Sequence, residues 1–148
     1  MKKLHFTITI AAPRETVWKT MLDDATYRQW TAPFSPDPST DSSYEGSWEQ
    51  GSDIRFVAPN KQGKPEGMYA RIAENRPHEF VSIQHIGEVR DGTEHPYPEP
   101  AFENYTFEDD GDGTKLTVDL DSDEKYADMF DDLWPKALEK LKQIAEAA

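Results

Sequence analysis

The C-terminal part of the chain predicts one long amphipathic helix, and this feature constrains the fold most. Between Asp123 and Ala147, apolar residues recur at the three- and four-residue spacings of a helix and form one broad stripe. The stripe consists of Tyr126, Phe130, Leu133, Trp134, Ala137, Leu141 and Ile144. Ser122 is a suitable N-cap, and Pro135 predicts a kink. Such a helix must bury its stripe against another layer of the molecule.

The residues before this helix predict that the other layer is a β-sheet. In residues 3–10, apolar side chains occupy every second position, which indicates a strand with one buried face. Pro13 ends this strand and starts a helix over 14–24, and a second short helix follows over 25–30. Further β patterns cover residues 44–49, 53–58, 68–74, 79–89, 103–108 and 115–121. The proline-rich segments 32–43 and 90–100 are predicted to be loops.

This order of elements predicts an α+β fold of the helix-grip type. Consecutive strands joined by short turns favour an antiparallel sheet. We therefore expect a curved antiparallel sheet of about six or seven strands wrapped around the long C-terminal helix, with two short helices after the first strand. No repeat and no domain-sized change in composition divides the chain, so residues 1–148 are expected to form a single domain.

The charge and composition exclude several classes of function. The 16 basic and 29 acidic residues give a net charge of −13, which disfavours binding to nucleic acid and to anionic membranes. The absence of cysteine excludes disulfides, thiolate zinc sites and cysteine nucleophiles. No apolar run is long enough for membrane insertion, and the first residues alternate instead of forming a signal core. We therefore expect a monomeric cytoplasmic protein.

The chain shows no recognised catalytic or metal-binding motif. It lacks the Gly-x-Ser-x-Gly, phosphate-loop, dinucleotide and His-Glu-x-x-His patterns. The acidic stretch from Asp109 to Thr114 has the look of a calcium loop, but its glycine spacing does not fit one, so a hairpin turn is the better interpretation. We therefore assign no catalytic residue, expect no cofactor and no metal, and favour a non-enzymatic role.

Two polar side chains are nevertheless expected on apolar strand faces. His85 shares its parity with Val81 and Ile83, and Tyr105 shares its parity with Phe107. Either could hold a polar group of a ligand or transfer a proton, and a general base at His85 would need a hydrogen-bonding partner. The alternative is that both are structural residues of an ordinary core. The four histidines form no metal-spaced pair, and His5 is predicted to face solvent.

Four segments resemble the packing motifs of one protein family. They are residues 6–13 with 15–18 (FTITIAAP and ETVW), residues 27–34 (YRQWTAPF), residues 46–51 (GSWEQG) and residues 134–142 (WPKALEKLK). Together they resemble the family named for homology to the activator of the heat-shock-protein-90 ATPase. That family belongs to the helix-grip START/SRPBCC superfamily, which also contains the birch-pollen-allergen-like proteins. The resemblance covers essentially the whole chain and carries no catalytic signature.

The resemblance implies an apolar cavity between the sheet and the closing helix, which superfamily members use for lipids, sterols, polyketides or other aromatic molecules. We therefore expect a small apolar or aromatic ligand as the partner of this chain. The candidate cavity residues are Trp30, Trp48, Phe56, Met68, Ala70, Ile72, Ile83, His85, Tyr105, Phe107, Phe130, Leu133, Trp134 and Leu138. The alternative is that these side chains simply fill one another as a solid core.

Two other functions stay open at this point. Members of the narrower family include domains that stimulate a chaperone ATPase, so the resemblance also implies a chaperone as a partner. A minority of the superfamily carry out chemistry in the cavity. The alternatives are therefore a chaperone-ATPase activator-like interaction protein, or an enzyme of the cyclase, dehydratase or hydrolase type, with His85 and Tyr105 as acid/base candidates.

Overall fold

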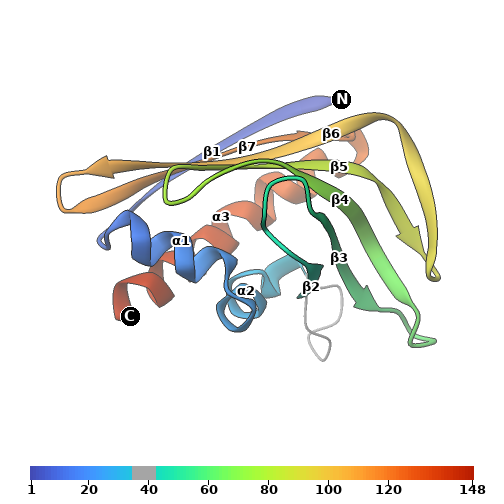
Figure 1. Ribbon diagram of the computed structural model, residues 1–148, viewed down its shortest axis with the longest axis horizontal. Coiled ribbons are helices and arrows are strands. Elements are labelled where there is room, and N and C mark those ends of the chain that lie inside the picture. The colour runs from blue at the N-terminus through green and yellow to red at the C-terminus, as the bar shows by residue number, and fades with distance from the viewer. Residues whose placement is uncertain (35–42) are drawn as a thin grey trace.

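The computed structural model describes residues 1–34 and 43–148 of the chain. Among these residues, seven strands form one antiparallel sheet in the order β1-β7-β6-β5-β4-β3-β2, and the helices lie on one of its faces (Figure 1). The elements are β1 (Lys2–Ile10), α1 (Arg14–Leu22), α2 (Asp24–Trp30), the 3-10 helix η1 (Ala32–Phe34), β2 (Ser43–Gly46), β3 (Asp53–Pro59), β4 (Pro65–Arg76), β5 (Phe80–Arg90), β6 (Thr93–Asp110), β7 (Gly113–Ser122) and α3 (Glu124–Ala147). The predicted α+β fold is confirmed. Most of the predicted loop 32–43 falls on residues 35–42, which lie outside the described residues.

The long helix α3 lies under the curved sheet, as its apolar stripe requires (Figure 1). Its buried residues are Ala127, Trp134, Ala137, Leu138, Leu141 and Ala145. The helix packs against β1, α1, α2 and η1. Near its N-terminal end the stripe is less well covered, because Tyr126 is exposed and Phe130 and Leu133 are only half-buried. Pro135 lies inside the helix, which is continuous from Glu124 to Ala147.

The N-cap of α3 is Asp123, and the prediction of Ser122 is wrong. The carboxylate of Asp123 accepts a hydrogen bond from the backbone N–H of Lys125 at 3.0 Å. Ser122 still belongs to β7, where it pairs with Lys2 of β1, and its buried hydroxyl donates to the carbonyl of Asp123. Sheet pairing therefore holds Ser122 in the strand, and the cap falls on the next residue.

The prediction of a loop over residues 90–100 is also wrong, because residues 93–100 belong to β6. Residues 93–96 pair with residues 87–90 of β5, which closes a hairpin at Arg90 and Thr93. The register then shifts, so that Pro96 lies opposite Gly87 but Ala101 lies opposite His85. Residues 97–100, with two of the prolines, fall in this irregular stretch. Proline lacks a donor for the sheet ladder, and the irregularity is where sheets tolerate it.

The pairing of β5 with β6 determines which side chains share the concave face of the sheet, which is the face that the helices cover. Val81 lies opposite Tyr105, and Ile83 lies opposite Glu103. Directly paired residues of antiparallel strands project to the same side of the sheet. The carboxylate of Glu103 therefore shares a face with the apolar residues of β5.

Candidate functional site

A cluster of three polar side chains lies on the concave face, among mostly apolar residues. The Nε2 atom of His85 on β5 is 3.1 Å from Oε1 of Glu103 on β6. The hydroxyl of Tyr105, also on β6, donates to the other carboxylate oxygen of Glu103. The side chains of His85 and Glu103 are only 6% and 16% exposed, and Tyr105 is 2% exposed. We call these three residues the polar cluster.

The local strand pattern explains how the polar cluster forms. Residues 103, 105 and 107 alternate with outward-facing neighbours along β6, so Glu103 and Tyr105 project to one side. The residue directly opposite His85 is Ala101, which has a small side chain. The imidazole can therefore reach diagonally past Ala101 to the carboxylate of Glu103, two residues further along β6.

The hydrogen-bond roles within the cluster follow from its electrostatics. Burial raises the pKa of Tyr105 well above its usual range, and the negative charge of Glu103 raises it further. The tyrosine therefore keeps its proton and acts as a donor to Glu103. Burial, and then the charge of Glu103, also raise the pKa of Tyr27. The Nδ1 atom of His85 is buried and has no hydrogen-bond partner within residues 1–34 and 43–148.

Aromatic rings surround the polar cluster. The ring of Phe56 lies 5.7 Å from the imidazole of His85, and the ring of Trp134 lies 6.2 Å from that of Tyr105. Tyr27 and Trp48 in turn contact Phe56, with centroids 6.2 Å and 5.8 Å away. The wall thus combines residues of the sheet, of α2 and of α3. It could hold a flat apolar molecule beside a small number of polar atoms.

The predicted site residues other than Phe107 fall into three groups. His85, Tyr105, Phe56, Trp48, Trp30 and Trp134 form a continuous network of ring contacts that also includes Tyr27. Ala70, Ile72, Ile83 and Leu138 are buried aliphatic residues of the core. Met68, Phe130 and Leu133 are half-buried. Phe107 lies apart from the cluster, because its ring contact is with Trp18 of α1, at 5.1 Å.

Sequence reasoning missed Glu103, which is the partner that His85 lacked. Glu103 shares its parity with Tyr105 and Phe107, but only the pairing of β5 with β6 brings it to His85. Two further residues were missed, Tyr27 of α2 and Tyr44 of β2, whose rings contact each other at 5.1 Å. The hydroxyl of Tyr44 donates to the carbonyl of Leu22 at 2.6 Å, and this bond ties β2 to the helices.

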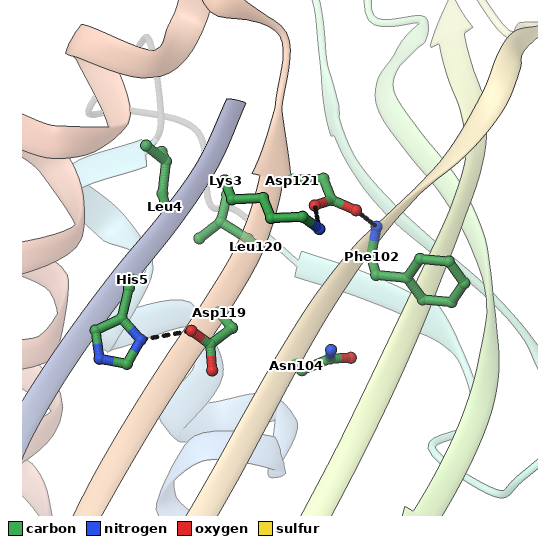
Figure 2. A pocket seen from close by; sticks show the side chains of 8 residues that line it. All are labelled: Lys3, Leu4, His5, Phe102, Asn104, Asp119, Leu120 and Asp121. Carbon is green, nitrogen blue, oxygen red and sulfur yellow. Dashed lines mark hydrogen bonds and ion pairs between the residues drawn. The ribbon is translucent and has the colours of Figure 1, made fainter. Parts of the chain in front are cut away.

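Two hollows of the described surface involve outward-facing side chains of the sheet. Figure 2 shows one of them, of about 370 Å³, where His5 pairs with Asp119 at 2.5 Å and Lys3 pairs with Asp121 at 3.1 Å. The side chains of His5 and Asp119 are 64% and 52% exposed, which confirms that His5 faces solvent. Exposed pairs of this kind are screened by water and contribute little.

The second hollow, of about 440 Å³, lies over β2 to β6. Its lining includes Arg55, Tyr69, Arg71 and Ala70, the last of which is one of the predicted cavity residues. Both arginines are already paired, Arg55 with Glu94 and Arg71 with Asp53. Neither hollow is lined by a member of the polar cluster.

The acidic stretch from Asp109 to Thr114 forms the predicted hairpin turn between β6 and β7. Asp110 pairs with Gly113, and Gly111 adopts a φ of +62°. Across the described ranges, no group of three or more histidine, aspartate or glutamate side chains is arranged to hold a metal ion. No helix in the same ranges combines the length and the apolar character needed to cross a membrane.

The sequence profile of the family described as "Activator of Hsp90 ATPase homolog 1-like protein" matches residues 11–146, which is nearly the whole chain. The chain belongs to this family. The AHSA1-like family is part of the helix-grip SRPBCC/START superfamily, so the resemblance found in the packing motifs is confirmed. No curated protein matches the sequence.

Solved structures share the fold of this AHSA1-like protein over almost its full length. A protein from Nitrosomonas europaea matches with a TM-score of 0.75 and 14% identity, over 98% of this chain and 94% of that one. The AHSA1-like protein from Aeromonas hydrophila matches with a TM-score of 0.72 and 17% identity, over 99% and 93% of the two chains. CalU16 from Micromonospora echinospora matches with a TM-score of 0.67 and 17% identity, over 96% and 73%. At these identities the likeness shows the fold alone.

Proposed function

We propose that this AHSA1-like domain binds a small, predominantly apolar or aromatic molecule on the concave face of its sheet. The support is an incompletely covered region of that face, which we call the open half. It consists of Tyr44, Trp48, Phe56 and Met68 from the β2 to β4 region and of Phe130 and Leu133 from α3, all of which are half-buried. A group of partly exposed apolar side chains at one place is more typical of a binding surface than of a closed hydrophobic core.

The polar cluster beside this surface carries the proposal. A buried polar atom without a partner costs roughly 1–3 kcal/mol, so an unpartnered ring nitrogen favours a ligand that would bond to it. His85 has one satisfied nitrogen, Nε2, and one buried unpartnered nitrogen, Nδ1. A ligand with a polar group would supply the missing hydrogen bond while its apolar part packed against the surrounding rings.

Phe56 and Met68 are the side chains that a ligand must displace. They pair across β3 and β4, both are half-buried, and the ring of Phe56 lies 5.7 Å from the imidazole of His85. Methionine is flexible and adapts to irregular shapes. We therefore infer that a ligand enters beside Met68 and moves the ring of Phe56 away from His85.

Binding of the uncharged fluorophore N-phenyl-1-naphthylamine tests this function. Its emission should rise when it binds to the wild-type protein. Met68→Lys, which places a charge in the open half, should weaken binding at least roughly tenfold because a charged amine is costly to bury. The matched control Thr7→Lys adds the same charge on the exposed face of β1 and should bind as the wild type does. Equal binding by both variants, or no rise in emission, would contradict the proposal.

A second candidate function is proton transfer to or from the bound molecule. The observation that favours it is the 3.1 Å contact between His85 and Glu103, since a carboxylate beside an imidazole is the usual arrangement of a histidine general base. Such a base would speed the exchange of the acidic C–H protons of 2-tetralone in D₂O, followed by NMR. An exchange rate equal to that of buffer, at protein concentrations that bind the ketone, would exclude this activity for 2-tetralone.

A further inference from the structure

The unpartnered Nδ1 atom of His85 indicates which chemical groups a ligand can present to it. The partner of Nε2 determines whether Nδ1 donates or accepts a hydrogen bond. His85 lies within a β-strand, so its Cβ projects to the concave face, and its side chain is more than nine-tenths buried. One ring nitrogen faces Glu103 and the other, Nδ1, has no partner in the described part of the chain. Any polar group that a ligand brings to His85 must therefore match Nδ1.

The arrangement around Glu103 determines which ring nitrogen carries the proton. A carboxylate accepts hydrogen bonds and has no proton to give. Its Oε2 accepts the hydroxyl proton of Tyr105, and its Oε1 is 3.1 Å from Nε2 of His85. Nε2 must therefore be the protonated nitrogen. In a neutral imidazole, the other nitrogen then presents a lone pair and acts as an acceptor.

We propose that the site selects uncharged aromatic molecules that carry a hydroxyl or N–H donor, of the phenol class, and that this donor binds to Nδ1 of His85. This inference rests on the proposed binding function and narrows its ligand class. A carbonyl or ether oxygen would meet the lone pair of Nδ1 without a proton between them. A carboxylate would also meet the buried charge of Glu103, within a chain whose net charge is −13.

The aromatic side chains around the polar cluster suit an aromatic ligand. Phe56 and Tyr27 offer aromatic surface beside His85, and Trp134 offers it beside Tyr105. Aromatic groups pack well against such rings in offset or edge-to-face contacts. A planar molecule with a donor at its edge could therefore pack against these rings while its hydroxyl reached the imidazole.

Three naphthalene derivatives of similar size test this selectivity. The wild-type protein should bind 2-naphthol at least roughly tenfold more tightly than 2-methoxynaphthalene, because the ether cannot donate to Nδ1. It should bind 2-naphthoate more weakly than either. His85→Phe should remove the preference for the hydroxyl and keep the binding of 2-methoxynaphthalene. The matched control His5→Phe, on the outer face, should preserve the preference.

The possible results separate this inference from the binding function on which it rests. If the wild type binds 2-naphthol and 2-methoxynaphthalene equally well, the inference is wrong and the binding function stands. If it binds neither, both are wrong for molecules of this size. If His85→Phe does not fold, a second measurement that needs only the wild-type protein still tests the inference. NMR of protein labelled with ¹⁵N-histidine should show that His85 carries its proton on Nε2 and a lone pair on Nδ1, and a proton on Nδ1 would overturn the inference.

Discussion

The concave face of the sheet has two halves that are made of similar residue types and covered very differently. In the covered half, β1 and β7 carry Ile10, Leu116 and Val118, which are fully buried in one core with Met21 of α1 and Leu141 of α3. In the open half, Phe56 of β3 and Met68 of β4 are only half-buried, because the closing helix packs mainly toward β1 and the other helices. Ala70 and Ile72 of β4 belong to the buried core. Helix coverage therefore decides which part of one continuous face is core and which part is available to a ligand.

Two methionines give the sharpest comparison of the halves. Met21 is completely buried in the covered half, whereas Met68 is half-buried in the open half. Met21→Ala should lower the free energy of unfolding by about 2–5 kcal/mol, because it leaves a cavity in packed surroundings. Met68→Ala should lower it by less than about 1 kcal/mol. Urea unfolding of both variants measures this, and equal losses would mean that the two halves are packed alike.

Two histidine–carboxylate pairs compare the polar cluster with the outer face. Glu103→Ala leaves the buried donors of His85 and Tyr105 unpaired, so it should lower the free energy of unfolding by about 1–3 kcal/mol. Asp119→Ala breaks the exposed pair with His5 and should change the free energy by less than about 0.5 kcal/mol. A small effect of Glu103→Ala, similar to that of Asp119→Ala, would contradict the description of a buried cluster.

The buried tyrosines predict a loss of stability at alkaline pH. Burial raises the pKa of Tyr105 in the folded state, whereas an unfolded tyrosine ionises near pH 10. The stabilisation linked to its proton is therefore complete below pH 10 and is lost as the pH rises toward the folded-state pKa. Urea unfolding above pH 10 should show a shallower loss for Tyr105→Phe than for the wild type. Identical pH dependence would show that Tyr105 ionises as readily in the folded protein as in the unfolded chain.

The fold could be predicted because its signals are local. The alternation of residues 3–10 and the helical stripe that ends at Ile144 depend only on neighbouring positions, and both elements formed as expected. The errors arose where pairing between strands overrides local preference. Prolines between His95 and Ala101 indicated a loop, but the hairpin with β5 and its register shift accommodate them within β6.

The candidate site could be predicted only in part, for the same physical reason. Parity placed His85 and Tyr105 on an apolar face, and both are buried there. The position of Glu103 depends on the register between β5 and β6, which no short stretch of sequence reveals. Carboxylates are usually exposed, so composition also argued against a buried Glu103. The contact that gives the site its chemistry was therefore the least accessible from the sequence.

NMR of protein labelled with ¹³C-methyl methionine tests the central claim, ligand binding at the open half, most directly. The chain has four methionines, of which Met21 lies in the covered half, Met68 lies in the open half and Met129 lies on the exposed surface of α3. Titration with 2-naphthol should shift the methyl resonance of Met68 in a saturable manner and leave that of Met21 unchanged. A saturable shift at Met21 without one at Met68, or no saturable shift at all, would contradict the account.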